Sequence, residues 1–132
     1  SITLVQQSFA KVVPIAETAA ALFYERLFTL DPSVKTLFKG DMKQQGRMLM
    51  QAIGLTVKGL QQPETILYTI QALGKRHKGY GVQTEHYATV GAALLWTLEQ
   101  GLGEAFTPEV KDAWTEAYTL LATVMQETAT GA

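Results

Sequence analysis

Two polar side chains interrupt apolar helical patterns in this sequence and are its clearest candidates for chemistry. Gln45 begins a file of residues, spaced three or four apart, that continues with Leu49, and His77 ends a similar file that contains Leu73. Residues with this spacing share one face of a helix. A buried amide or imidazole without a hydrogen-bond partner costs on the order of 2–7 kcal/mol. We therefore expect a group in the interior that satisfies both side chains.

The motifs of the common hydrolases and nucleotide-binding enzymes are absent from the sequence. It contains no HExxH zinc motif, no glycine-rich phosphate loop and no nucleophile elbow. It also contains no cysteine, which excludes a disulfide, a thiolate nucleophile and a thiolate metal site. Any metal must therefore be held by other ligands.

The composition indicates a folded domain with more apolar residues than a minimal core requires. Of the 132 residues, 47% are hydrophobic and 17% are charged, and we expect a single domain over residues 1–132. A net charge of −1 gives no electrostatic reason to expect nucleic acid or an anionic membrane as a partner. Neither a signal peptide nor a run of about 18 uncharged apolar residues is present. We therefore expect a soluble, cytoplasmic protein.

Helical spacing of apolar residues recurs in nearly every segment between prolines and glycines, whereas strand patterning is nearly absent. The sequence therefore predicts an all-α fold. Asp31 with Pro32, and Thr107 with Pro108, are typical helix starts. Gln45 falls on a helix over about residues 43–60, and His77 ends a short helix that opens at residue 63. A further helix is expected over about residues 84–100, followed by a turn at residues 101–103.

A set of residues in fixed register runs along essentially the whole chain. It consists of Phe23-Tyr24, Leu27-Phe28, Asp31-Pro32, Leu37-Phe38, Gln45, Leu49, residues 74–78 with His77, residues 80–82, and His86-Tyr87. Phe38 follows Pro32 by six residues, and it lies fourteen after Tyr24 and seven before Gln45. This set resembles the bacterial single-domain globins that are similar to the globin domain of flavohaemoglobins. The resemblance implies the globin fold, in which helices A, B, C, E, F, G and H surround a haem pocket.

The resemblance implies a haem b group, iron protoporphyrin IX, with His77 as the axial ligand of its iron. On the distal side it implies Tyr24 and Gln45, which can both donate hydrogen bonds to a bound gas. The other residues that it places at the haem are Phe38, Leu49, Leu73, Val82 and Tyr87. Because glutamine is a poor iron ligand, the ferrous iron should be five-coordinate and open to O2, CO or NO.

The activity that goes with this resemblance is less defined. Flavohaemoglobins convert nitric oxide and oxygen to nitrate with a flavin reductase domain that follows the globin domain. This sequence ends at Ala132, so the same reaction would need a separate reductase. The family's proximal glutamate position, eleven residues after Tyr118, holds Ala129, and Glu127 should face elsewhere. Without that carboxylate the axial imidazole donates less electron density.

Each candidate taken alone also fits an ordinary structural role. A lone histidine on an apolar helix face is usually a core or surface residue, and a lone tyrosine is often half-buried with its hydroxyl on a carbonyl. Three hypotheses therefore remain. We favour a globin that binds oxygen reversibly for storage, delivery or sensing. The second hypothesis is a nitric oxide dioxygenase with a separate reductase, and the third is a haem-free helical interaction module.

Overall fold

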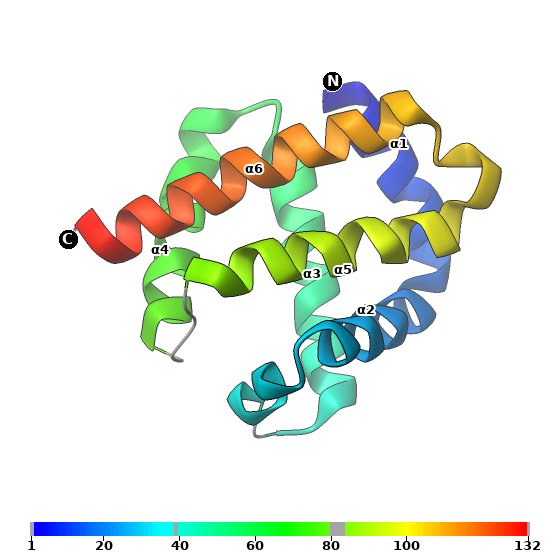
Figure 1. The fold of residues 1–132 in the computed structure, drawn as a ribbon. Coiled ribbons are helices and arrows are strands. Elements are labelled where there is room, and N and C mark those ends of the chain that lie inside the picture. The colour runs from blue at the N-terminus through cyan, green and yellow to red at the C-terminus, as the bar shows by residue number, and fades with distance from the viewer. Residues whose placement is uncertain (1, 39, 80–83, 132) are drawn as a thin grey trace.

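The structure is a computed structural model that describes residues 2–38, 40–79 and 84–131, and these residues form helices and no strand. The α-helices are α1 (Ile2–Val12), α2 (Ala16–Leu30), α3 (Met42–Gly59), α4 (Pro63–Gly79), α5 (Thr84–Leu102) and α6 (Pro108–Gly131). Three short 3-10 helices are η1 (Val13–Ile15), η2 (Pro32–Leu37) and η3 (Gly103–Ala105). The predicted all-α fold is thus confirmed (Figure 1). Among the described helices, none has the length and apolar character needed to cross a membrane.

Side-chain caps explain where several of these helices begin. The carboxylate of Asp31 accepts a hydrogen bond from the backbone N–H of Ser33 at 3.1 Å, at the start of η2. The carboxylate of Asp41 accepts one from the N–H of Lys43 at 3.0 Å, at the start of α3. Such caps satisfy N–H groups that have no partner within the helix. The predicted start at Asp31 is confirmed, and the cap at Asp41 adds the signal that places the first turn of α3.

Helix α4 begins at Pro63 and ends at Gly79, two residues after His77, so its predicted bounds are close, but with 17 residues it is not the short helix that was predicted. Gly74 lies in the interior of this helix. A Cβ atom on Gly74 would lie 2.5 Å from the carbonyl oxygen of Met125, so the glycine allows α4 to pack closely on α6. Helix α5 continues through Gly101 to Leu102, and the chain reverses only at Gly103, whose φ of 55° favours glycine.

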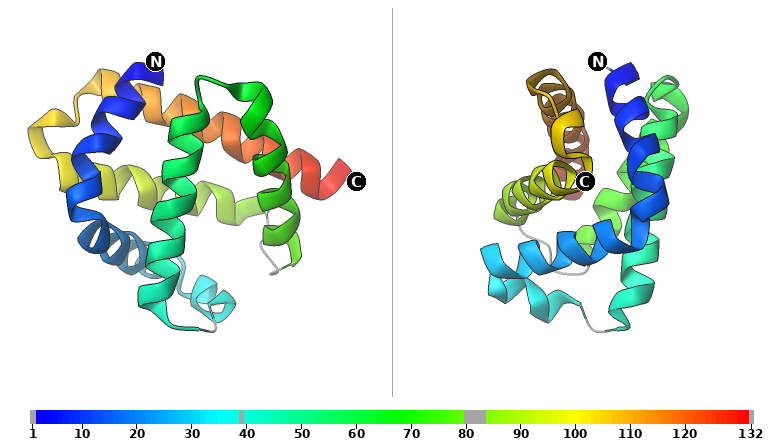
Figure 2. Two further views of the ribbon diagram at one scale, coloured as in Figure 1. Left: turned by 180° about the vertical axis from the view of Figure 1, so that it is seen from behind. Right: turned by 90° about the vertical axis from the view of Figure 1, so that its right-hand side faces the viewer.

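Helices α3 and α4 lie on one side of the molecule, and α5 and α6 run along the other (Figures 1 and 2). The short connection at residues 60–62 makes α3 and α4 antiparallel. The first turn of α3 and the last turn of α4 therefore lie at the same end of the molecule (Figure 2, left). Gln45 lies in the first of these turns and His77 in the second.

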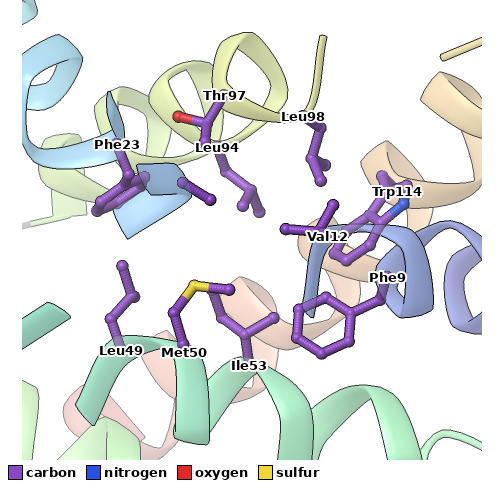
Figure 3. A pocket seen from close by; sticks show the side chains of 11 residues that line it. Phe9, Val12, Phe23, Leu49, Met50, Ile53, Leu94, Thr97, Leu98 and Trp114 are labelled. Atoms are coloured by element: carbon purple, nitrogen blue, oxygen red, sulfur yellow. The ribbon is translucent and has the colours of Figure 1, made fainter. Parts of the chain in front are cut away.

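The largest core cluster joins α1, α2, α3, α5 and α6 around Trp114, which is 4% exposed. Its indole N–H donates to the hydroxyl oxygen of Ser8 at 2.8 Å, and that hydroxyl donates to the carbonyl of Leu4 at 2.6 Å. The indole N–H and the Ser8 hydroxyl, both buried, thus each have a hydrogen-bond partner. A cavity of about 20 Å³ lies beside this cluster among apolar side chains that include Phe9 and Leu49 (Figure 3). It has room for about one water-sized molecule.

Candidate functional site

Tyr24 and Gln45, the predicted distal pair, lie next to each other in the structure. Tyr24 is on α2 and only 8% exposed, and its hydroxyl donates to the backbone carbonyl of Gln45 at 3.3 Å. Gln45 is half-buried in the first turn of α3, where its N–H donates to the carbonyl of Asp41 at 3.0 Å. Two helices thus bring a phenol and an amide residue together across 21 positions of sequence.

A close crossing of α2 and α3 brings this pair into contact. A Cβ atom on Gly46 would lie 3.0 Å from the Cβ of Ala20, and both residues are buried. Ala20 lies one helical turn before Tyr24, and Gly46 directly follows Gln45. Two small residues allow the backbones to approach, so the tyrosine hydroxyl can reach the carbonyl of Gln45.

Aromatic rings hold the side chain of Tyr24 in place. Phe23 and Phe38 each meet its ring edge to face with centroids 5.2 Å apart, and Phe28 stacks on it at 6.0 Å. Burial raises the pKa of Tyr24 to about 12, so the hydroxyl keeps its proton near neutral pH. Tyr24 is therefore a positioned hydrogen-bond donor. Leu49 packs against the same cluster.

His77 lies in the last turn of α4 with its side chain half-buried. Its Nδ1 atom is 2.7 Å from the carbonyl oxygen of Leu73. A carbonyl oxygen only accepts hydrogen bonds, so Nδ1 must carry the hydrogen. In the neutral imidazole the electron pair then resides on Nε2, the nitrogen able to bind a metal. Leu73 and Tyr87 both pack against a separate cluster whose buried residues lie on α4 and α6.

Tyr118 is a residue beside this second cluster for which the sequence predicted no role. Its hydroxyl donates to the carbonyl of Tyr87 at 2.7 Å and so links α6 to the first turn of α5. Burial, and to a smaller extent the nearby Tyr87, raises the pKa of Tyr118. A Cβ atom on Gly91 would lie 2.8 Å from the Tyr118 ring, so the two helices also pack closely here. The sequence signal that could have identified it is its position: Tyr118 is an aromatic residue with a hydroxyl group, four residues after Trp114 on the apolar face of α6.

Some predicted residues lie outside the described residues or away from the site. Val82 is outside the described part of the chain, and so is the side chain of Ala129. Glu127 is exposed, as expected for a residue that faces elsewhere. Within the described residues, no group of three or more His, Cys, Asp or Glu side chains is placed to hold a metal ion.

The remaining predicted residues form two groups. Tyr24, Phe38 and Leu49 belong to a cluster that joins α2, η2, α3 and α5, whereas Leu73 and Tyr87 pack against the buried residues that join α4 to α6. The polar side chains are the imidazole of His77, next to Leu73 of the second group, and the phenol of Tyr24 with the amide of Gln45 at the first group. One axial nitrogen, apolar walls and distal donors are what a haem with a gas ligand requires. The residues present therefore fit a haem.

Comparisons with known proteins agree with this fold. The family model for globins matches residues 21–125, and the chain belongs to the globin family. A flavohemoprotein of Rhodopirellula baltica is 32% identical over 94% of this chain, and one of Vibrio cholerae is 33% identical over 85% of it. The chain covers only 31% and 30% of these two relatives.

A solved structure shares the same architecture. It is an engineered carbene transferase, named as a nitric oxide dioxygenase from Rhodothermus marinus, with a TM-score of 0.88 and 25% identity. The match covers 98% of this chain and 91% of that one. The globin fold predicted from the register of residues is thereby confirmed.

Proposed function

We propose that residues 1–132 act as one globin domain that binds haem b through His77 and takes up O2 reversibly. The observation that carries this proposal is the contact between His77 Nδ1 and the Leu73 carbonyl at 2.7 Å. It orients the ring from the last turn of α4 and leaves the electron pair of the neutral imidazole on Nε2. When bound, a ferrous haem supplies an open position for a diatomic gas and electron density for dioxygen.

The distal residues would hold a polar gas ligand by hydrogen bonds. The hydroxyl of Tyr24 and the side-chain amide of Gln45 can both donate hydrogen bonds, and the proposal assigns both to the distal side of the haem. A hydrogen bond to a charged acceptor contributes about 1.5–3 kcal/mol, which slows release by roughly 10- to 150-fold. CO develops less negative charge than O2 and gains less from the same donors. The pair therefore favours retention of O2.

One acceptor beside His77 Nδ1, the backbone carbonyl of Leu73, supports reversible binding. Leu73 provides a neutral carbonyl, whereas a carboxylate would make the imidazole a stronger electron donor. A less electron-donating axial ligand favours binding of O2 over cleavage of its O–O bond. This is the expectation that follows from Ala129 at the position of the family's glutamate.

Titration of the purified protein with hemin tests the proposal. We expect saturable uptake, and ferric, ferrous and CO-bound spectra that show one axial histidine and a five-coordinate ferrous iron. His77→Ala should lose or loosely hold hemin, whereas His86→Ala should bind it normally. A wild-type protein that stays colourless in hemin contradicts the proposal. A normal five-coordinate ferrous spectrum in His77→Ala contradicts the assignment of the ligand.

A second candidate function is nitric oxide dioxygenation with a separate reductase. It is favoured by the relatives named flavohemoprotein and by the structural neighbour named as a nitric oxide dioxygenase. The two distal donors suit either function. Stopped-flow mixing of the oxygenated protein with NO, followed by turnover with an added flavin reductase, separates them. Fast single oxidation without efficient re-reduction favours O2 binding, and sustained turnover favours the enzyme.

A further inference from the structure

The hydroxyl of Tyr24 has one hydrogen, and in this structure the carbonyl of Gln45 accepts it. A gas ligand held by Tyr24 needs the same hydrogen. We propose that the Gln45 carbonyl competes with the gas for the Tyr24 hydrogen bond, and that the contact of Gly46 with Ala20 sets the balance. This inference rests on the proposed function and assigns Gly46 as a positioning residue of the distal site.

The existing bond is weak enough for the competition to be close. Its oxygen–oxygen distance of 3.3 Å exceeds the 2.7–2.8 Å that is usual for O–H···O bonds. The bond nevertheless satisfies a hydroxyl that is buried on α2 and would lose stability without a partner. The retention that Tyr24 gives to a gas is therefore the difference between two hydrogen bonds. A change in the weaker bond should appear directly in the rate of gas release.

Gly46 controls this distance because its nitrogen is joined to the Gln45 carbonyl carbon in one peptide unit. An added methyl group would lie 3.0 Å from the Cβ of Ala20, so α2 and α3 must separate by a few tenths of an ångström. The ring of Tyr24 packs against Phe23, Phe28 and Phe38 and cannot easily follow α3. The hydroxyl-to-carbonyl distance should therefore lengthen, and the hydroxyl becomes more available to the gas.

The test uses the Gly46→Ala variant of the haem-loaded protein. We expect O2 dissociation to slow by roughly twofold, on the order of one weakened neutral hydrogen bond, and CO dissociation to stay unchanged. A second readout is the ring 13Cζ signal of Tyr24 in the diamagnetic CO-bound protein, assigned with Tyr24→Phe. This signal reports the hydrogen bond of the hydroxyl directly, and it should shift in Gly46→Ala.

Two matched variants separate competition from a general disturbance of the helix crossing. In a Tyr24→Phe background, Gly46→Ala should have no effect on O2 release, because no shared hydrogen remains. The swapped pair Ala20→Gly with Gly46→Ala keeps one methyl group at the crossing and should restore the wild-type rate and the Tyr24 signal. An unchanged or faster O2 release in Gly46→Ala overturns the inference. A slowing that persists in the Tyr24→Phe background does so as well.

Failure of this inference is distinguishable from failure of the proposed function. A protein that takes up no hemin overturns both. If hemin binds and Tyr24→Phe releases O2 faster, but Gly46→Ala behaves as wild type, the distal role of Tyr24 stands and the competition alone is rejected.

Discussion

Tyr24 and Gln45 reach the same place from different helices, and each offers a different kind of donor. The tyrosine is fixed by three aromatic rings and can turn only its O–H bond. The glutamine is half-buried at the start of α3 and has a longer side chain with more rotamers. The phenol should therefore give the stronger and better aligned hydrogen bond to a gas.

Removal of either donor should speed oxygen release. Tyr24→Phe should raise the O2 dissociation rate by about tenfold or more, and Gln45→Leu should raise it by a smaller factor. CO dissociation should change much less in both variants. Stopped-flow displacement of O2 by CO measures the first rate, and Thr29→Ala, which removes an exposed hydroxyl of α2, is the control. Unchanged O2 release in both distal variants removes this assignment.

The raised pKa of Tyr24 predicts how stability depends on alkaline pH. In the unfolded chain tyrosine loses its proton near pH 10, whereas in the folded protein Tyr24 keeps it until about pH 12. The resulting stability is full below pH 10 and is lost as the pH rises to about 12, by on the order of 2 kcal/mol. Urea unfolding from pH 9 to 12 should show a smaller loss in Tyr24→Phe than in wild type. Equal slopes in both proteins contradict the prediction, and Thr29→Ala should keep the wild-type slope.

At this scale the sequence identifies side chains but not their partners. Tyr24, Gln45 and His77 could be singled out because helical spacing and family register depend on position along the chain. The acceptor of the Tyr24 hydroxyl is a backbone carbonyl on another helix, and any residue type could have supplied it. The bond from Tyr118 to the carbonyl of Tyr87 was missed for the same reason.

At the scale of helices, glycines control how closely the elements pack. Gly74 on α4 faces the backbone of Met125 on α6, and Gly91 on α5 faces the ring of Tyr118. Prolines and capping residues could be used to predict helix starts because their effect is local. A glycine within a helical pattern is ambiguous in sequence, since it can end a helix or allow a close crossing. Gly101 is the position where this ambiguity led to a wrong helix end, because α5 continues through it to Leu102.

Gly74→Ala should destabilise the protein although alanine is the better helix former. The new methyl group would lie 2.5 Å from the carbonyl oxygen of Met125, and backbone atoms cannot move aside as a flexible side chain can. We expect a loss of about 1–3 kcal/mol, against a gain of about 1 kcal/mol if helix propensity alone acted. Urea unfolding measures the difference. Gly40→Ala is the control, because a Cβ atom at Gly40 meets nothing within 4 Å.

At the scale of the whole molecule, the two halves of the site belong to different core clusters. The cluster around Tyr24 joins α2, η2, α3 and α5, and the cluster around Leu73 joins α4 to α6, with Tyr87 of α5 packed against it. The sequence could predict that both groups are apolar and could order them along the chain. It could not show that the first turn of α3 and the last turn of α4 lie at the same end of the molecule, because that depends on the direction in which the two helices pack.

A cofactor held by both clusters should stabilise the folded protein as a unit. Ligand at about 100 times its dissociation constant adds about 2.7 kcal/mol to the free energy of unfolding. We expect hemin to raise the Tm by on the order of 10 °C. The rise should largely vanish in His77→Ala and persist in His86→Ala. Calorimetry or circular dichroism at several hemin concentrations measures it, and a Tm independent of hemin contradicts it.

Helix α6 has a further consequence for folding during translation. Trp114 of α6 bonds to Ser8 of α1 across 106 positions of sequence, and Met125 of the same helix packs on α4. While α6 is still inside the ribosome, α1 and α4, the helix that carries His77, lack the α6 residues that pack against them. Under the proposed function, capture of haem during translation would therefore wait until α6 has emerged.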